Sequence, residues 1–370
     1  MKNELNIGIV GAGNFAAFAA SAFLKLEGVR ILAVSDTFEQ AGRKLANRLT
    51  AAFHTDYIHL LADKRIDLVY IATPPFLHYT ISKEALRSGK HVICEKPAAL
   101  NHEEAEELQE MAKQAGLLYV VNLMQRYNPL YRQVSAIINE GILGAFLHGY
   151  FENYASDEYL DKAHWFWKES MSGGIFIEHG VHFFDMFSGW LGKGEVINAI
   201  QLTRPGTQPS VIDRVHATLL YPQGIVNFYH GFDQPKILDR QEMRLQFERG
   251  DITLYEWVPV SMKLHGLIQQ DGKKRLLEIL DTGTVSLDSH HEKTVQAKGR
   301  FKDITYDDLV TIHYHNRKDK ETLYQQLLTD MLLDQWQWIR DRSHARVIND
   351  SNAVESLRVA VEAKEKALQF

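Results

Sequence analysis

Two residues that lie far apart in the sequence have the chemistry needed to remove a proton from a hydroxyl group. Lys96 stands in the triplet Glu95-Lys96-Pro97, where its ammonium group can hold a substrate oxygen and stabilise negative charge on it. His182 stands in the run 172–185, and histidine is a general base suited to neutral pH. The pair predicts chemistry on a CH–OH group, provided that the fold brings the two side chains together.

Two carboxylates accompany His182 if the run around it is helical. At about 100° per residue, Glu178, His182 and Asp185 fall within about 60° of one another, so a carboxylate could orient the imidazole. Glu178, His179 and His182 also resemble metal ligands. Adjacent residues do not share a helical face, however, and no other His/Asp cluster has convincing ligand spacing, so we expect no metal. An ordinary helix with structural hydrogen bonds is the other interpretation.

A glycine pattern near the start of the chain is typical of dinucleotide binding. Gly11, Gly13 and Ala16 form G-x-G-x-x-A between a predicted strand and a predicted helix. The first glycine allows a tight turn, and the second lets the backbone approach a pyrophosphate. The N-terminus of the helix then offers amide N–H groups to the anion. A glycine-rich turn without a ligand is the alternative.

Asp36 ends the second predicted strand and bears on the choice of cofactor. Its carboxylate can accept hydrogen bonds from both ribose hydroxyls, and it repels a 2′-phosphate. The sequence therefore favours NAD over NADP. NADP stays possible because Arg43 or Lys44 in the next helix could offset the charge.

The elements of the first 122 residues alternate between strand and helix. The predicted strands cover residues 5–10, 30–35, 52–54, 68–73, 91–94 and 118–122, with helices between them. This alternation predicts an α/β fold with a parallel sheet covered on both faces, a Rossmann domain. Ligands of such sheets bind outside the carboxyl ends of the strands, so the loops that contain Gly11, Thr73 and Lys96 should line one cleft.

The pattern changes after residue 122. Helices are predicted over 128–140, 176–191, 318–342 and 352–368, and strands over 144–154 and through most of 195–314. This predicts a second α/β domain with a mostly antiparallel sheet. We divide the chain into a dinucleotide-binding domain, 1–122, and a substrate and oligomerisation domain, 123–370, whose last helix could pack back on the first domain.

The composition excludes several classes of protein. The chain has 370 residues, with 41 Lys plus Arg against 47 Asp plus Glu, a net charge of −6 that argues against a nucleic-acid binder. Its single cysteine, Cys94, excludes an internal disulfide. Residues 7–24 carry no charge, but glycines and Asn14 interrupt them and Glu4 precedes them, which argues against a signal peptide or membrane span. We expect a cytoplasmic protein.

The motifs together resemble those of the Gfo/Idh/MocA oxidoreductases. The glycine loop, the strand end A-T-P-P-x-x-H, the triplet E-K-P and the run S-G-G…E-x-G-x-H-x-x-D follow the family's order over nearly the whole chain. The resemblance implies NAD(P)-dependent hydride transfer to or from a secondary hydroxyl of a sugar, inositol or similar polyol. Two alternatives stay open: a glycosidase-like elimination with no net redox change, and a non-enzymatic sensor of dinucleotide and sugar.

The resemblance and the strand-end positions give a set of site residues. The catalytic residues are Lys96, His182 and Glu178, which stands where the family usually has aspartate. The expected cofactor-binding residues are Gly11, Gly13, Asn14, Phe15, Asp36, Thr73, Pro74, His78, Glu95, Lys96 and Asn122, and the expected substrate-binding residues are Arg126, Trp165 and Asp185.

The resemblance also implies a large open sheet in the second domain, which similar proteins often use for self-association. The predicted strand 225–232 is rich in apolar and aromatic residues, more than a lone monomer usually exposes. We therefore expect a homodimer or homotetramer that forms through the open sheet.

Overall fold

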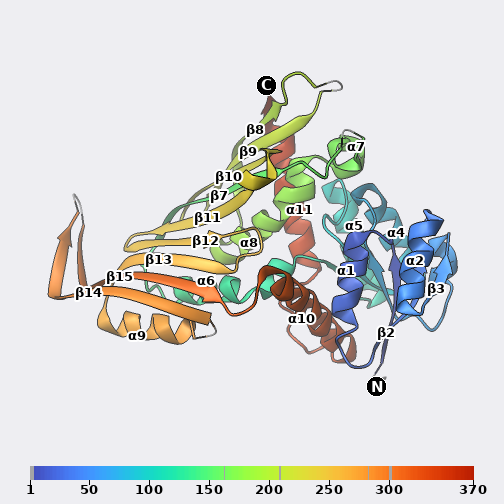
Figure 1. Cartoon of the computed structure of the whole chain (residues 1–370), viewed down its shortest axis with the longest axis horizontal. Coiled ribbons are helices and arrows are strands. Elements are labelled where there is room, and N and C mark those ends of the chain that lie inside the picture. The colour runs from blue at the N-terminus through green and yellow to red at the C-terminus, as the bar shows by residue number, and fades with distance from the viewer. Residues whose placement is uncertain (1–3, 162, 208–209, 282, 300–301) are drawn as a thin grey trace. The chain divides into compact units, whose positions relative to one another are not determined.

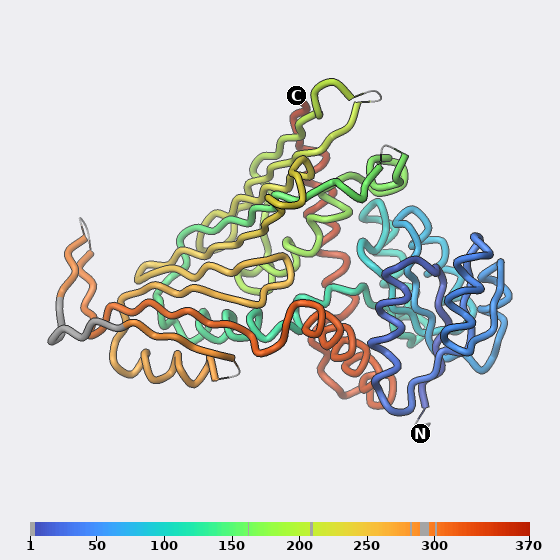
Figure 2. Tube along the Cα trace, viewed as in Figure 1, coloured from blue at the N-terminus to red at the C-terminus, as the bar shows by residue number. Residues whose placement is uncertain are grey.

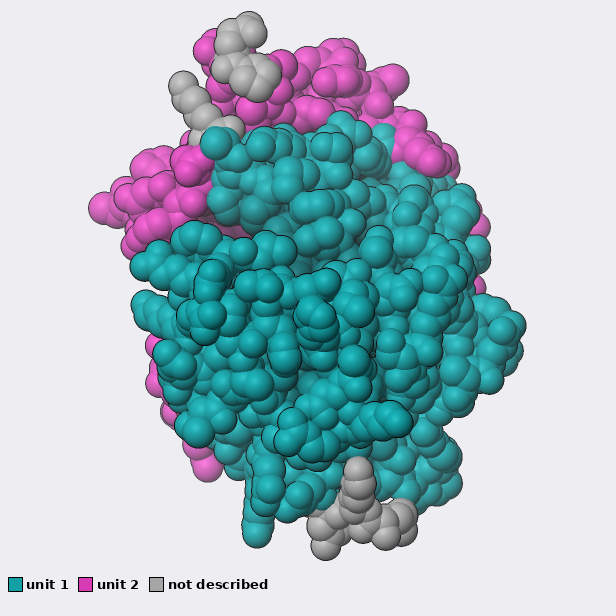
Figure 3. All heavy atoms as spheres, turned by 90° about the vertical axis from the view of Figure 1, so that its right-hand side faces the viewer, with its two compact units in different colours: residues 1–127, 162–185, 324–364 teal, residues 128–161, 186–323, 365–370 magenta. Residues whose placement is uncertain are grey.

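The computed structural model of the chain describes residues 4–161, 163–207, 210–281, 283–299 and 302–370. The chain forms two compact units, which Figure 3 shows in two colours. Unit 1 comprises residues 1–127, 162–185 and 324–364, and unit 2 comprises residues 128–161, 186–323 and 365–370. Each unit is made of three separate stretches of the chain. Figure 2 shows the trace of the chain from end to end. A compact unit is not the same as an independently folding domain, so the boundary at residue 122 stays a prediction.

Unit 1 contains a six-stranded parallel sheet with the order β3-β2-β1-β4-β5-β6 (Figure 1). Its strands are β1 (Leu5–Val10), β2 (Val29–Ser35), β3 (Ala52–His54), β4 (Leu68–Ile71), β5 (His91–Cys94) and β6 (Tyr119–Val121). The residues of β4 are all buried, as those of a central strand covered on both faces should be. The expected parallel Rossmann sheet is thus confirmed.

Helices cover both faces of this sheet. They are α1 (Asn14–Phe23), α2 (Glu39–Leu49), α3 (Tyr57–Leu61), α4 (His78–Arg87), α5 (His102–Ala115), α7 (Glu169–Ser172), α10 (Lys320–Arg340) and α11 (Asp350–Lys366). Because parallel crossovers are right-handed, α1 and α2 lie on one face and α4 and α5 on the other. Tyr324 of α10 packs its ring against Phe15 and Phe18 of α1. Gln109 of α5 donates a hydrogen bond to Asp350 of α11.

Short helical turns connect several of these elements. The 3₁₀ turns are η1 (Pro75–Leu77), η2 (Met124–Tyr127), η3 (Trp165–Trp167) and η5 (Lys236–Leu238), and η4 (Phe176–Gly180) is a π-helical turn. The last of these runs directly into α8 (Val181–Leu191). Helix α8 belongs to unit 1 as far as Asp185 and to unit 2 from Met186.

Unit 2 contains a ten-stranded sheet with the order β14-β15-β13-β12-β11-β7-β10-β9-β8-β16. Its strands are β7 (Phe146–Ser156), β8 (Glu195–Thr203), β9 (Ile212–Tyr221), β10 (Gly224–Gln234), β11 (Arg240–Phe247), β12 (Gly250–Tyr255), β13 (Ser261–Ile268), β14 (Gly283–Lys298), β15 (Asp303–Asn316) and β16 (Ala367–Gln369). Strand pairs β7–β10 and β8–β16 are parallel, and the other neighbours are antiparallel. The expected mostly antiparallel sheet is confirmed.

One face of this sheet is covered by helices (Figure 1). Besides the second half of α8, they include α6 (Pro129–Asn139) and α9 (Gln270–Ile279). The ring of Trp190 stacks on Tyr131 of α6, and Phe187 packs edge-on against Phe228 of β10. Helix α9 was not predicted, because only strands were expected in this part of the chain. Half of its residues are charged, and Leu276 is its one buried residue.

The other face of the sheet is more polar than the sequence suggested. In β10 the apolar Val226 and Phe228 are fully buried, whereas Asn227 and Tyr229 alternate with them on the opposite face and Ile225 is 44% exposed. The apolar surface expected from this strand therefore lies mainly in the core. Self-association through the open face stays a prediction, and it cannot rest on Val226 and Phe228.

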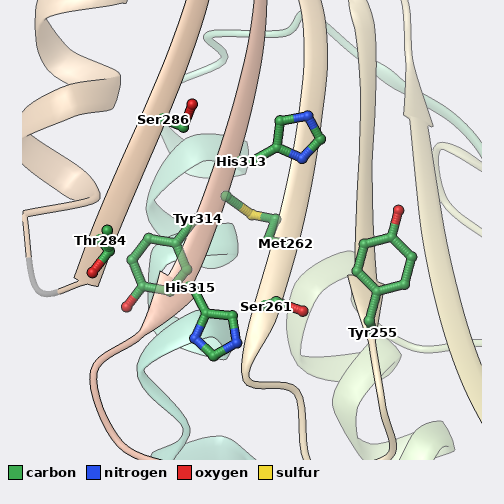
Figure 4. A pocket seen from close by; sticks show the side chains of 8 residues that line it. All are labelled: Tyr255, Ser261, Met262, Thr284, Ser286, His313, Tyr314 and His315. Carbon is green, nitrogen blue, oxygen red and sulfur yellow. The ribbon is translucent and has the colours of Figure 1, made fainter.

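A shallow pocket of about 310 Å³ lies on four neighbouring strands of this sheet (Figure 4). It is lined by Tyr255, Ser261, Met262, Thr284, Ser286, His313, Tyr314 and His315. No cluster of three or more His, Cys, Asp and Glu side chains in the described part of the chain could hold a metal ion. Among the described helices, none combines the length and the apolar character needed to cross a membrane.

Candidate active site

Lys96 is held by the segment that carries Glu178 and His182, and all three residues belong to unit 1. Lys96 comes two residues after β5, at the carboxyl edge of the sheet. Its Nζ donates a hydrogen bond of 2.7 Å to the backbone carbonyl of Glu178 and forms an ion pair with the carboxylate of the same residue. The fold thus brings together residues that are 82 positions apart.

The helical run that contains Glu178 differs from its predicted form. A single helix was expected over 176–191, but the first turn, η4, is π-helical and α8 follows it. A π turn closes i→i+5 hydrogen bonds, so a spacing of 100° per residue does not hold through it. Glu178 directs its carboxylate to Lys96, and Asp185 directs its carboxylate to Arg126. Orientation of the His182 imidazole by a carboxylate stays a prediction. Such π turns are frequent at functional sites.

His182 lies at the first turn of α8 and is 6% exposed. Burial lowers the pKa of its imidazole well below the usual 6.5, and the positive charge of Lys96 lowers this pKa further. Both effects disfavour the imidazolium form. The side chain is therefore a neutral imidazole at physiological pH, which is the form that can accept a proton.

Arg126 and Asp185 form a buried, multiply bonded ion pair. The guanidinium donates to the two carboxylate oxygens of Asp185 over 2.7 and 2.8 Å, and also to its backbone carbonyl over 2.7 Å. Asn352 of α11 donates to the same carboxylate over 3.2 Å. This cluster fastens η2 and α11 to α8 next to His182. The expected contact of Arg126 and Asp185 with substrate stays a prediction.

Glu95 is the centre of a third cluster, which joins three adjacent strands. Its Oε1 accepts hydrogen bonds from the hydroxyl group of Tyr70 in β4 and from the amide of Asn122, over 2.8 Å, at the end of β6. The sequence analysis missed Tyr70. A tyrosine in an otherwise apolar, fully buried strand was the available signal, because a buried phenol needs a hydrogen-bond partner.

The glycine loop has the geometry that a pyrophosphate requires. Gly11 has a φ of +98°, and a Cβ there would lie 2.4 Å from the carbonyl oxygen of Ala72. A Cβ on Gly13 would meet no atom within 4 Å, so nothing in the described protein fills the space over this residue. Helix α1 starts at Asn14 without a side-chain cap or an acidic residue in its first turn. Its terminal N–H groups can therefore bind an anion.

Asp36 holds the glycine loop from the neighbouring strand. One carboxylate oxygen accepts the N–H of Ala12 over 2.6 Å, and the other accepts the N–H of Phe38 over 2.7 Å. Arg43, which could attract a 2′-phosphate, is bonded to Glu39 over 2.7 Å and lies over the ring of Phe53. Neighbouring side chains thus engage Arg43. The preference for NAD over NADP stays a prediction.

Two buried polar atoms near Lys96 and Glu95 have no partner in the described structure: Oγ1 of Thr73 and Oδ1 of Asn122. A buried polar group without a hydrogen bond costs about 1–3 kcal/mol, and such groups usually mark a bound ligand or water. Both residues were expected to contact the cofactor. With the open space over Gly13, they fit a dinucleotide that lies along the carboxyl edge of the sheet.

Other expected site residues support the loops. Both ring nitrogens of His78 lie within 2.8 Å of backbone carbonyls, those of Thr73 and Pro97, so His78 joins the two strand-end loops. Pro74 comes just before η1. Trp165 opens η3 and packs against the rings of its neighbours in the chain.

Comparison with known proteins agrees with this fold and site. Residues 5–123 match "Oxidoreductase family, NAD-binding Rossmann fold", and residues 131–253 match "GFO/IDH/MocA C-terminal domain". Together the two matches define an NAD(P)-dependent oxidoreductase. The chain belongs to the Gfo/Idh/MocA family of oxidoreductases.

Individual relatives are distant and varied. Oxidoreductase P35 of Formosa agariphila is 28% identical over 277 residues, 73% of this chain and 85% of that protein. The scyllo-inositol 2-dehydrogenase (NAD(+)) of Bacillus subtilis is 27% identical over 194 residues, 52% of this chain and 55% of that protein. The structure of KijD10, a 3-ketoreductase from Actinomadura kijaniata in complex with NADP and TDP-benzene, has a TM-score of 0.76 at 18% identity and covers 99% of both chains. This last likeness concerns the fold alone.

Proposed function

We propose that the protein oxidises a secondary hydroxyl group of a sugar, an inositol or a similar polyol, with NAD as its cofactor. One observation carries the proposal: Lys96 is bonded to Glu178 on the segment that also carries the buried His182. The charge of Lys96 adds to the lowering of the imidazole pKa by burial. An ammonium group beside a neutral base is the arrangement that deprotonation of an alcohol requires. The similarity to scyllo-inositol 2-dehydrogenase supports a polyol as the substrate class.

The proposed roles follow from the contacts of each side chain. Two of the three N–H bonds of the Lys96 ammonium are directed to Glu178, and in the described structure the third stays available for a substrate oxygen. Glu178 keeps the ammonium in place. His182 accepts the hydroxyl proton, while the charge of Lys96 stabilises the negative charge that develops on the oxygen.

Other loops at the same carboxyl edge of the sheet would hold the cofactor. The glycine loop and the N-terminus of α1 bind the pyrophosphate, and Asp36 accepts the ribose hydroxyls. When bound, the dinucleotide supplies the acceptor for the hydrogen that leaves the carbon as hydride. The balance is one substrate CH–OH converted to C=O, with the proton taken by His182 and the hydride by NAD.

A substrate screen tests the proposal. The purified chain is incubated with NAD and a panel of sugars and inositols, and the absorbance band of reduced nicotinamide is followed. We expect net formation of NADH with at least one polyol. Conversion of a sugar without net NADH would instead support the elimination reaction, and tight NAD binding without any turnover would support a sensor.

A further inference from the structure

The loops after β4 and β5 leave the sheet at neighbouring positions, and strand pairing does not extend into them. The pairing of these strands ends at Ile71 and Cys94, with one further bond from the N–H of Glu95 to the carbonyl of Ile71 over 2.8 Å. Beyond this bond, the first loop carries Thr73 and the second carries Lys96. Contacts other than strand pairing must therefore hold one loop relative to the other.

The side chain of His78 lies between these two loops. Its Nδ1 is 2.7 Å from the carbonyl oxygen of Pro97, and its Nε2 is 2.8 Å from that of Thr73. His78 is 1% exposed, so both ring nitrogens face the protein and neither is open to a ligand. The ring extends from the first residue of α4, a helix that packs on β4 and β5 and buries Ile81 and Ala85.

The chemistry of the imidazole decides how it can bond both loops. Carbonyl oxygens only accept hydrogen bonds, so each contact needs an N–H of the ring. Burial lowers the pKa of His78, although the two carbonyls oppose this shift. The neutral ring has one N–H, and its two tautomers donate to one carbonyl each. Exchange between the tautomers thus lets one side chain bond both loops.

Both loops carry residues of the proposed site. We propose that His78 is a positioning residue, which places the loop of Lys96 for reaction and the loop of Thr73 for cofactor binding. The inference rests on the proposed function. In this arrangement His78 fixes the backbone beside Lys96 through Pro97, and Glu178 fixes the ammonium group at the other end of the same side chain.

Two substitutions separate the two bonds. The amide nitrogen of asparagine lies near the position of Nδ1 in histidine, and that of glutamine lies near the position of Nε2. His78→Asn therefore keeps a donor for the carbonyl of Pro97 and loses the one for Thr73, whereas His78→Gln keeps the donor for Thr73 and loses the one for Pro97.

The two variants should affect different kinetic and binding constants. A misplacement of about 1 Å can lower a rate about 10²-fold, so His78→Gln should lower kcat by about 10–10². The dissociation constant of NAD, measured by calorimetry, should stay within about twofold in this variant. His78→Asn should weaken NAD binding about tenfold and lower kcat by less than about threefold.

Hydrogen exchange of the cofactor-free protein gives a second readout, which needs neither substrate nor NAD. In His78→Gln, the amides of residues 96–99 should exchange about tenfold faster than in the wild type, and those of residues 73–77 should not change. His78→Asn should show the reverse pattern. A purely structural role would destabilise both variants without dividing the effects between the loops. Equal patterns in the two variants, or one variant that matches the wild type in every measurement, would contradict the proposal.

His91→Gln is the matched control, because His91 makes a comparable bond at the opposite end of β5. Its Nδ1 accepts the N–H of Leu118 over 2.9 Å, at the amino edge of the sheet. The variant should lower stability and leave kcat and the dissociation constant of NAD within about twofold. A fall of kcat equal to that of His78→Gln would assign both effects to a general loss of stability and overturn the proposal.

The wild type alone tests the inference if neither His78 variant folds. Amides of residues 73–77 and 96–99 that exchange as fast as those of an unfolded chain would show that the ring does not hold the loops. A wild type that binds no NAD and turns over no polyol would instead overturn the proposed function, while the exchange pattern still tests His78. The two failures are therefore distinguishable.

Discussion

Two ion pairs attach the same helical segment to the parallel sheet, and they differ in how completely they are satisfied. Asp185 in α8 receives three hydrogen bonds from Arg126 and a fourth from Asn352, and the two paired side chains are 2% and 13% exposed. Glu178 in the π turn bonds Lys96 through its backbone carbonyl and its carboxylate. The side chain of Glu178 is 12% exposed, and that of Lys96 is 18% exposed.

The two pairs also differ in whether the buried oxygens around them have hydrogen-bond partners. Near Lys96, the buried oxygens of Thr73 and Asn122 lack partners in the described structure. At Asp185, both carboxylate oxygens and the backbone carbonyl are occupied. A saturated pair suits a supporting role, and a pair with unused donors and acceptors beside it suits ligand binding. The comparison thus supports the proposed division of this segment into supporting and reacting residues.

The largest effect that tests this separation is expected at His182. His182→Asn should lower kcat by about 10²–10⁴, because general-base catalysis is lost. Binding of NAD, measured by calorimetry, should survive. His179→Asn in the same segment is the matched control and should keep most of the activity. Turnover of His182→Asn close to that of the wild type would contradict the assignment of this residue.

Arg126→Met tests the saturated pair. Removing one partner of a buried ion pair costs about 3–5 kcal/mol of unfolding free energy, because Asp185 is left buried and unpaired. Lys96→Met should cost less stability and more activity. Denaturant unfolding of both variants, with steady-state kinetics on the same preparations, checks the contrast. Equal losses of stability would show that the two pairs do not differ as proposed.

Asp36→Ala examines a carboxylate whose oxygens are engaged by backbone N–H groups and yet are expected to bind ribose. The loss of hydrogen bonds to a charged group costs about 1.5–3 kcal/mol, so NAD should bind roughly tenfold more weakly or worse. NADP should weaken less or bind more tightly. Calorimetry with both dinucleotides provides the measurement, and a wild type that prefers NADP would refute this view of Asp36.

The smallest expected effect is a displacement of the pH profile. Because burial and Lys96 lower the pKa of His182, its base form persists below pH 6.5. The acidic limb of kcat/KM should therefore lie below pH 6.5, where an ordinary histidine would already be protonated. An acidic limb at or above pH 6.5 would show that His182 is not the titrating base.

The same shift affects stability with a definite sign. A histidine whose pKa is lower in the folded than in the unfolded protein favours unfolding once the unfolded form takes up its proton. The unfolding free energy should hence fall as the pH falls below 6.5, and His182→Asn should reduce this dependence. Burial lowers the pKa of His91 to about 4 and acts in the same direction, so the dependence should be reduced and not abolished.

Local patterns in the sequence were sufficient to predict the parallel sheet of unit 1 and the glycine loop. A run of apolar residues is enough to predict a buried strand, and the spacing of Gly11 and Gly13 is enough to predict the tight turn between a strand and a helix. Helix α9 was missed because it is short, half of its residues are charged, and it buries only Leu276. Its formation depends on packing against distant parts of the chain.

The candidate site was predictable as a set of residues and not as a set of contacts. The motifs named Lys96, Glu178 and His182. They did not show that Glu178 pairs with Lys96, nor that a π turn carries Glu178, because both depend on tertiary packing. The bonds of Arg126 to Asp185 and of Tyr70 to Glu95 join segments that no local pattern connects. Long-range pairing of this kind needs the three-dimensional structure.

The division of unit 1 into three stretches of chain has a consequence for the order of events during synthesis. The rings of Phe15 and Phe18 on α1 find Tyr324 as a partner only after 300 further residues have been made. Domains usually fold as they leave the ribosome, N-terminal part first. Until α10 has been made, Phe15 and Phe18 of α1 therefore lack the ring of Tyr324 that packs against them in the folded protein. A chaperone that shields exposed aromatic residues would find its first target on this protein at that helix.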